Sequence, residues 1–193
     1  MMGRAAVVLA CLLSCSCVPW TVQPIGDAGP DRPFDAEAYV DSIWRSKVLP
    51  AAAQAVEVAD FLKAPRTCLV KGQGKIVALD IGSRTGLIMV DLPPYDGRAD
   101  ILVQIGPVIR GTALRDALPF IQFSQFVNQM QYAAVGNALN GRVVKNAIPK
   151  ALTVGLEVSF SGAAAAPEAG RLPEVVPVTL EVGHATRRRL PNG

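Results

Sequence analysis

The hydrophobic period of this chain changes at Pro65, and that change limits the folds open to it. Before Pro65, apolar residues recur every three or four positions, which predicts a helix. After Pro65 they alternate or run together in short stretches typical of strands. A second helical pattern, from Thr112 to about Ile148, separates three strand-like segments from two more. The expected strands cover residues 68–80, 83–91, 100–106, 153–161 and 175–182.

This succession predicts an α+β fold that is mainly β with added helices. Three strands, a helical crossover and two further strands (β-β-β-α-β-β) follow the order of an OB-type five-stranded barrel. A helix packed over an open five-stranded sheet is the alternative. Gly72 and Gly74 favour the barrel, because glycine suits the bulge or bend that a long first strand needs for closure. Asp96-Gly97 marks a turn between the second and third strands.

The segment before Pro65 predicts one long amphipathic helix over about residues 35–63. Asp35 is a good N-cap, and Phe34 and Tyr39 are placed to form a hydrophobic staple around it. Pro50 should kink this helix near Ser46, whose carbonyl loses its donor. Its apolar stripe, expected to pack on the sheet, consists of Val40, Trp44, Val48, Ala51, Ala55, Ala59 and Leu62. In the second helical region, we expect breaks at Pro119, Gly136 and Gly141.

The N-terminus predicts an exported, lipidated protein. Arg4 precedes the apolar run 5–13 and small residues follow, which is the pattern of a signal peptide; the run is too short to span a membrane. A leader of residues 1–14 would end before Cys15, the favoured lipidation site, with Cys17 as the alternative. An ordinary cleaved signal with incidental cysteines is the competing interpretation. Cys68 is expected to be a buried strand residue.

The remaining chain divides into a tether, a domain and a tail. Residues 15–33 are rich in proline and glycine and predict an extended tether, residues 34–183 a single domain, and residues 184–193 a basic tail. Removing the leader takes Arg4 with it, so the excess of basic over acidic residues falls from +3 to +2. This near-neutral charge, 6% aromatic residues and an export signal argue against nucleic-acid binding.

Candidate functional residues concentrate between the third strand and the second helical region. Arginine forks and amides there suit a site for sugar hydroxyls or a carboxylate, with Phe126 or Tyr132 as a flanking aromatic ring. In the alternative, structural interpretation, Asp116 pairs with an arginine and the amides satisfy helix ends. The candidates, several of which we expect to gather at one end of the barrel, are Arg84, Gln104, Arg110, Arg115, Asp116, Asn128 and Gln129.

Catalytic and metal-binding chemistry has weak support in the sequence. His184 is the one histidine, which leaves little for a metal site or a triad, and we expect no metal and no cofactor. The aspartates at strand ends and turns are expected to serve backbone geometry; they are Asp80, Asp91, Asp96 and Asp100. Asp116 has no convincing partner for acid–base work, so we expect a protein that is not an enzyme.

Four segments resemble a family of predicted periplasmic lipoproteins of unknown function: 34–51, 70–86, 102–123 (LVQIGPVIRGTALRDALPFIQF) and 126–140. The resemblance covers most of residues 34–182, and its third segment is specific to the family. It implies an OB-like barrel preceded by a helix. It also implies a gene neighbourhood of ribose-type sugar ABC transporters, and hence an accessory role in sugar uptake. The 62–68 link is shorter than in many relatives, and Cys15 and Cys17 blur the lipidated position.

These observations predict a lipid-anchored accessory or binding module on the periplasmic face of the cell envelope. Its expected partners are the membrane, through the N-terminal lipid, and transporter components or a small sugar. The alternatives are an enzyme acting on a sugar or envelope glycan, and a purely structural envelope protein. Neither Ser16 nor Val18 is the aspartate that usually retains lipoproteins in the inner membrane, which favours the outer membrane.

Overall fold

A computed structural model describes residues 34–149 and 151–183. The predicted leader, lipidation site, tether and basic tail lie outside the described residues. The helices are α1 (Ala36–Ile43), the π-helix η1 (Trp44–Val48), α2 (Leu49–Ala53), α3 (Val58–Lys63), α4 (Ala113–Asp116), the 3₁₀ turn η2 (Phe123–Gln125) and α5 (Gln129–Asn146). The strands are β1 (Val56–Glu57), β2 (Cys68–Asp80), β3 (Leu87–Asp91), β4 (Ile101–Gln104), β5 (Glu157–Ala164) and β6 (Glu174–Val182).

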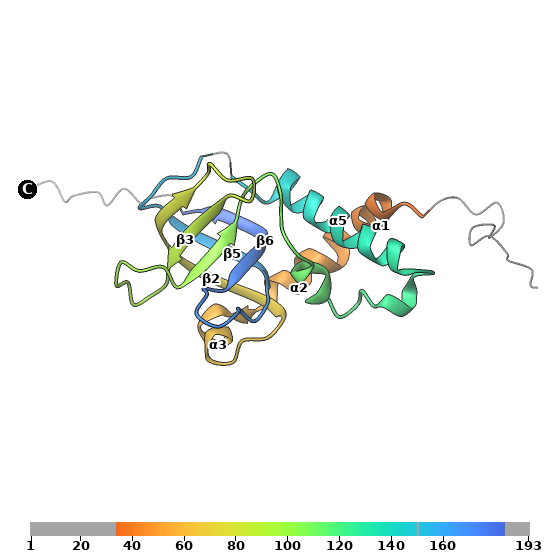
Figure 1. The fold of residues 1–193 in the computed structure, drawn as a ribbon, viewed down its shortest axis with the longest axis horizontal. Helices are drawn as coiled ribbons and strands as arrows, with labels where there is room; N and C mark the ends of the chain where they lie inside the picture. The colour runs from red at the N-terminus through yellow and green to blue at the C-terminus, as the bar shows by residue number, and fades with distance from the viewer. Residues whose placement is uncertain (1–33, 150, 184–193) are drawn as a thin grey trace, which may run out of the picture. The chain divides into compact units, whose positions relative to one another are not determined.

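The five longer strands form a closed barrel, as the strand order predicts. They pair in the order β2-β3-β4-β6-β5, and a β2–β5 pairing closes the ring (Figure 1). The pairs are antiparallel except for β4 and β6, which run parallel. This one parallel pairing follows from the helical crossover between β4 and β5, and it brings the end of β4 beside the start of β6.

The long strand β2 takes part in both halves of the barrel. Its first part, from Cys68 to Lys75, pairs with β5, and its last part pairs with β3. Gly74 lies where the partner changes, and a Cβ atom there would come within 2.5 Å of the Asp91 carbonyl oxygen. The bulge expected near the glycines falls instead between Ile76 and Ala78. Glycine is therefore needed at position 74 for close approach, while the bulge a few residues on adjusts the register.

The expected single helix over residues 35–63 is wrong in its second half. Asp35 caps α1 as predicted, accepting a hydrogen bond from the Ala38 nitrogen at 3.0 Å. The π-helical turn η1 stands where Pro50 was expected to kink the helix. After α2 the chain becomes extended as β1, because Val56 and Glu57 pair in parallel with β2. Tertiary pairing thus overrides a helical pattern that continues through this point.

The separate helix α3 buries a different face from the one its pattern predicts. Val58 and Phe61 are buried among the residues inside the barrel, whereas Ala59 and Leu62 of the predicted stripe are exposed. Because β1 resets the direction of the chain, the apolar stripe of the first helices does not continue through α3. This helix therefore belongs to the barrel, not to the preceding helical segment.

The second helical region begins with short pieces and ends in one continuous helix. Thr112 precedes α4, but its hydroxyl donates to the Asp116 carboxylate and accepts no hydrogen bond from the helix backbone. The predicted breaks at Gly136 and Gly141 are absent, since α5 runs through both. Each glycine costs a helix about 1 kcal/mol. Burial of α5 against α1 and the barrel offsets that cost.

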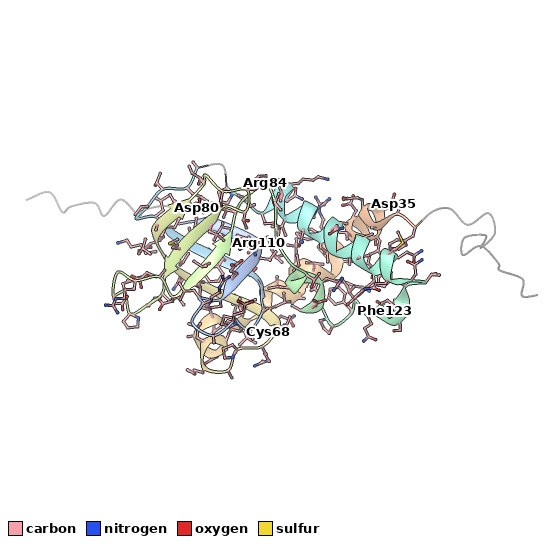
Figure 2. All side chains as sticks on the ribbon, in the orientation of Figure 1. Asp35, Cys68, Asp80, Arg84, Arg110 and Phe123 are labelled. Atoms are coloured by element: carbon pink, nitrogen blue, oxygen red, sulfur yellow. The ribbon has the colours of Figure 1, made fainter. Side chains whose placement is uncertain are left out.

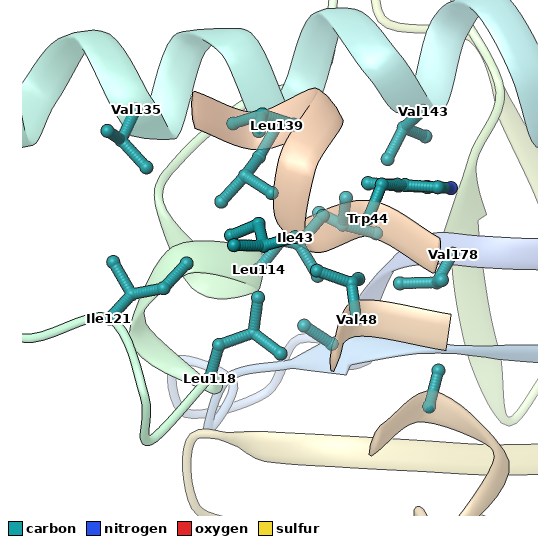
Figure 3. Packing of buried hydrophobic residues seen from close by; sticks show 14 of the residues in the cluster. Ile43, Trp44, Val48, Leu114, Leu118, Ile121, Val135, Leu139, Val143 and Val178 are labelled. Atoms are coloured by element: carbon teal, nitrogen blue, oxygen red, sulfur yellow. The ribbon is translucent and has the colours of Figure 1, made fainter. Parts of the chain in front are cut away.

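Two apolar cores lie on opposite sides of the wall formed by β5 and β6. One fills the barrel interior and includes Phe61, Ile76 and Phe160. The other lies between the barrel wall and the helices, where Trp44 packs among residues of α4, α5 and β6 (Figure 3). Neighbouring residues of β6 serve different cores: Val175 faces the barrel interior and Val176 the helices.

Several expected boundaries are displaced for local reasons. β3 begins at Leu87 and not at residue 83, because the Asp80 carboxylate and the Ser83 hydroxyl hold a turn before it. β4 is shorter than expected, and β5 begins at Glu157 and continues through Gly162–Ala164. Those small residues pair with the start of β2 and are buried. Cys68, expected to be buried, is a half-buried free thiol.

Candidate functional site

The end of β4 carries a buried glutamine that organises the surrounding polar groups. The Gln104 side chain is 3% exposed. Its carbonyl Oε1 accepts from the Arg110 backbone nitrogen at 2.7 Å, and its Nε2 donates to Glu174 Oε2 at 3.0 Å. Both ends of the amide are therefore used, and the loop after β4 is fixed to the first residue of β6.

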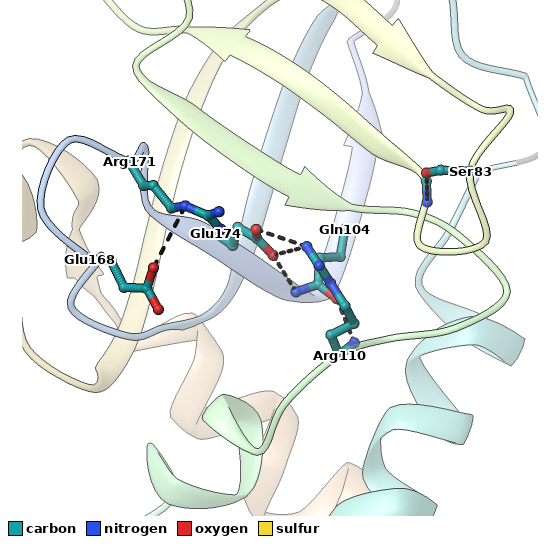
Figure 4. A network of polar contacts seen from close by, with 7 residues as sticks. Ser83, Gln104, Arg110, Glu168, Arg171 and Glu174 are labelled. Atoms are coloured by element: carbon teal, nitrogen blue, oxygen red, sulfur yellow. Dashed lines mark hydrogen bonds and ion pairs between the residues drawn. The ribbon is translucent and has the colours of Figure 1, made fainter.

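Arg110 and Glu174 complete this group. The arginine Nη2 donates to Glu174 Oε1 at 2.9 Å and to Oε2 at 3.1 Å (Figure 4). Glu174 can be reached because β4 and β6 run parallel, with Leu102 opposite Glu174. The Arg110 side chain is 53% exposed, so the ion pair itself contributes little to stability. Its geometry instead holds the guanidinium at the rim of a cavity.

That cavity, called the Gln104 pocket below, has a volume of about 420 Å³. Besides Gln104, Arg110 and Glu174, it is lined by the segment 165–168, with Arg171 and Leu172 from the loop before β6. Thr112, which precedes α4, and Asp116, its last residue, also line it. Arg171 Nε lies 3.6 Å from Glu168 Oε2. Every carboxylate that lines the pocket is thus within an ion-pairing distance of an arginine.

Asp116 is engaged from both of its oxygens. Arg115 contacts Oδ1 through Nε at 2.9 Å and through Nη2 at 2.8 Å, and the Thr112 hydroxyl donates to Oδ2 at 2.6 Å. The Arg115 guanidinium carbon also lies 3.9 Å from the Tyr132 ring centroid. This arrangement agrees with the structural interpretation of Asp116, in which it pairs with an arginine.

Asn128 and Gln129 lie away from the pocket. Asn128 caps α5, accepting a hydrogen bond from the Gln131 nitrogen at 2.9 Å, and Gln129 is the exposed first residue of the helix. Asn140 lies twelve residues further along α5 and donates at 3.0 Å to the carbonyl oxygen of Gly111, which lines the pocket. This contact marks the end of α5 that lies near the pocket. At 1.5 Å per residue, Asn128 is about 18 Å from that end. Phe126 and Tyr132, the expected flanking rings, do not line the pocket either.

Arg84 stands apart from the other candidates. It is exposed in the loop between β2 and β3, where its carbonyl oxygen accepts from the Val108 nitrogen at 3.2 Å. Figure 2 labels it together with Arg110, and Arg84 does not line the Gln104 pocket. Of the seven candidates, the pocket brings together Gln104, Arg110 and Asp116.

Sequence reasoning missed Glu174, which joins two of the candidates. In the sequence, Glu174 stands alone before a strand-like run, with no polar neighbours that indicate a site. The signal that could have found it is topological. In the expected strand order the third and fifth strands are neighbours, so a charged residue at the start of the fifth lies near the third.

Two larger cavities flank β2 on other parts of the barrel. Their volumes are about 630 and 580 Å³, and both are lined by Glu57, Gly72 and Gln73. In the first, the hydroxyls of Ser161 and Thr179 are 2.7 Å apart and satisfy each other. Neither cavity contains a buried amide that ties charged groups together, so the Gln104 pocket is the better defined polar site.

Within residues 34–149 and 151–183, no three or more His, Cys, Asp or Glu side chains are grouped so as to hold a metal ion. Among the helices of those same residues, none has both the length and the apolar character to cross a membrane.

Comparison with known proteins identifies the family. The model of the family described as "Predicted periplasmic lipoprotein (DUF2291)" matches residues 5–65 and 62–181. The chain belongs to this family. The lipoprotein is therefore assigned to the cell envelope, on the periplasmic side and anchored by lipid, as the cysteine cluster predicts. No curated protein matches it.

Solved structures establish the fold of the lipoprotein. An OB-fold protein from Thermotoga maritima is 16% identical, with a TM-score of 0.61, and the alignment covers 79% of this chain and all of that one. An OBody bound to hen egg-white lysozyme is 13% identical, with a TM-score of 0.33, covering 60% of this chain and 94% of that one. The first similarity confirms the OB-like barrel.

Proposed function

We propose that this lipoprotein is a non-catalytic periplasmic module whose Gln104 pocket binds a small neutral polyhydroxy ligand. The sugar handled by a ribose-type ABC transporter is the ligand that fits this role. One observation carries the proposal: a buried amide holds an arginine and a glutamate together at the rim of a cavity of about 420 Å³. Such a group presents donors and acceptors in fixed positions without needing to rearrange.

The charges around the pocket favour a neutral ligand over an anion. Arg110 and Arg171 lie among three carboxylates of the lining, those of Asp116, Glu168 and Glu174. Because each arginine already faces a carboxylate, no unopposed positive charge of the lining is left to attract a phosphate or carboxylate ligand. Sugar hydroxyls both donate and accept hydrogen bonds, so they can join paired guanidinium and carboxylate groups without separating them.

A glycan-acting enzyme has less support. Glycoside hydrolysis uses two carboxyl groups about 5–10 Å apart on either side of the scissile bond. Asp116, the best candidate from sequence, has both oxygens engaged by Arg115 and Thr112. We therefore favour binding without catalysis.

Isothermal titration calorimetry tests the proposal directly. The full chain with Cys15→Ser and Cys17→Ser, which removes both predicted lipid sites, is titrated with D-ribose and other pentoses, and with the sugar-binding protein of the cognate transporter. We expect heat of binding with a pentose. Arg110→Gln should weaken binding about 10- to 100-fold, the effect of losing a hydrogen bond to a charged group.

Lys71→Gln is the matched control, because Lys71 is also partly exposed and lines a different cavity. It should leave the affinity unchanged. Heat with the transporter protein alone would make the module a protein-binding one and would reject the sugar site. Absence of heat with every partner would reject the proposal as a whole.

A further inference from the structure

An exposed apolar surface lies at the end of the domain where the described chain begins. It consists of Phe34, Phe123, Val127 and Met130, whose exposed fractions are 36%, 53%, 85% and 81%. We call it the distal patch. Figure 2 places Asp35, the neighbour of Phe34, and Phe123 at the same end of the helical part of the domain. None of these four residues lines the Gln104 pocket, so the patch is a different surface.

Aromatic rings connect two members of the distal patch, Phe34 and Phe123. The Phe34 ring is 5.6 Å from that of Phe126, which is 5.6 Å from Tyr132, and Tyr132 is 5.6 Å from Phe123. Phe34 at the chain entry and Phe123 before α5 therefore belong to one connected group of rings. Edge-to-face and tilted contacts of this kind favour a defined arrangement of the Phe34 and Phe123 rings.

The segment that supplies three of the four patch residues carries no charge. Residues 117–141 contain no aspartate, glutamate, lysine, arginine or histidine. The polar residues next to Phe123, Val127 and Met130 include the amides Gln125, Asn128 and Gln129, whereas the acidic Asp35 stands next to Phe34. Moving this segment out of water therefore avoids the cost of desolvating ionised groups, which is the main obstacle to burying a protein surface.

We propose that the distal patch docks on the lipid bilayer that holds the N-terminal anchor. The favoured anchor, Cys15, is nineteen residues before Phe34, so the linking chain reaches at most roughly 65 Å. Phe34, one of the patch residues, is thus the point at which the domain is joined to this chain. A covalent anchor keeps its local concentration at the bilayer high, so even weak insertion of a few apolar side chains suffices to orient the domain.

The size of the patch favours a bilayer over a second protein. Stable protein interfaces bury roughly 800 Å² on each partner. Four partly exposed side chains offer considerably less than that. A bilayer interface requires no such area, because apolar and aromatic side chains partition into it individually.

Tryptophan fluorescence of the full, lipidated protein tests this docking. The protein is reconstituted into vesicles of phosphatidylethanolamine and phosphatidylglycerol, with or without brominated acyl chains that quench nearby tryptophan. The reporter is Val127→Trp in a Trp20→Phe background, where Trp44 stays buried in the helical core and adds a constant signal. We expect the emission of the introduced indole to shift to the blue and to be quenched by brominated lipid.

Ile81→Trp is the matched control, because Ile81 is 78% exposed and lies in the loop between β2 and β3. Its emission should stay unshifted and unquenched. Adding Met130→Asp to the Val127→Trp protein should abolish the quenching while thermal unfolding stays unchanged, since Met130 is exposed. Equal quenching of both reporters, or none at position 127, overturns the proposal. A blue shift without quenching means that protein covers the patch, and it overturns the proposal too.

Discussion

Most aspartates of this domain serve the backbone, as their positions at strand ends and turns predict. Asp91 Oδ2 accepts from the Gly97 nitrogen and Asp100 Oδ2 from the Leu92 nitrogen, both at 2.8 Å, so the two carboxylates hold the loop between β3 and β4 from both sides. Asp80 accepts from the Ser83 nitrogen in the turn after β2. Short acidic side chains at such places satisfy turn donors, so their presence there does not by itself indicate acid–base chemistry.

Asn128 tests whether an amide side chain, like these carboxylates, serves the backbone and not the binding site. Its side chain caps α5, so Asn128→Ala should lower the free energy of unfolding by about 1 kcal/mol. It should leave pentose binding unchanged, because Asn128 does not line the Gln104 pocket. Urea unfolding and calorimetry measure the two effects. Gln129→Ala, one residue on and exposed, is the control and should change neither; a loss of binding in Asn128→Ala would restore Asn128 to the site.

Tyr39 should make stability sensitive to alkaline pH. Burial raises the pKa of the Tyr39 phenol above its usual value of 10.0. The folded state therefore favours the neutral phenol. The contribution of Tyr39 to the free energy of unfolding is fully present below pH 10.0, and it is lost as the pH rises through the pKa of the folded state. Tyr39→Phe removes the titration. The difference in the free energy of unfolding between wild type and Tyr39→Phe should therefore shift against the wild type above about pH 10; a constant difference would contradict this.

At the scale of elements, the local patterns identified the type of most segments but not their ends. Strand β6 was predicted almost to the residue, because its apolar run has no competing period. The helix over 35–63 failed after Ala53, because the pairing of β1 with β2 is a long-range contact that no local period reveals. Helix propensity predicts breaks at Gly136 and Gly141, because it takes no account of the burial of α5, which offsets the cost of both glycines.

The sequence likewise predicts only part of the candidate site. Gln104 and Arg110 could be chosen because they flank the end of one strand in a short stretch of sequence. Their partner Glu174 comes from a strand that is distant in sequence and adjacent only in the barrel. The residue type of Asn128 suits a binding site, and its capping role becomes evident only once the start of α5 is known.

Strand β2 provides the sharpest test of an element. A Cβ at Gly74 would lie within 2.5 Å of the Asp91 carbonyl oxygen, a backbone atom that cannot turn aside. Gly74→Ala should therefore destabilise the domain by about 1–3 kcal/mol or more. Gly82→Ala is the control, since its nearest neighbour would be Asp80 Oδ1 at 4.0 Å. Equal stabilities of the two variants in urea would show that the barrel can relax around position 74.

For the whole molecule, the important feature is that two cores share one wall. Residues of β5 and β6 face either the barrel interior or the helices, so both strands carry buried residues on both faces. Strands of this kind become nearly continuous apolar runs, which is what the sequence shows over 175–180. The helices cannot keep their packing surface if the barrel opens, because Val176 and Val178 would move away with β6.

Unfolding should consequently be a single cooperative transition. A destabilising substitution in one core should therefore also shift the unfolding signal that reports on the other core. Phe61 fills the barrel interior, and Phe61→Ala should cost about 3–5 kcal/mol. In a Trp20→Phe background, fluorescence reports on Trp44 in the helical core, and far-UV circular dichroism reports on the whole domain. Both signals should shift together to lower urea concentration, whereas Leu62→Ala, on the exposed face of the same helix, should shift neither appreciably. A Trp44 transition that stays in place in Phe61→Ala would show that the two cores unfold independently.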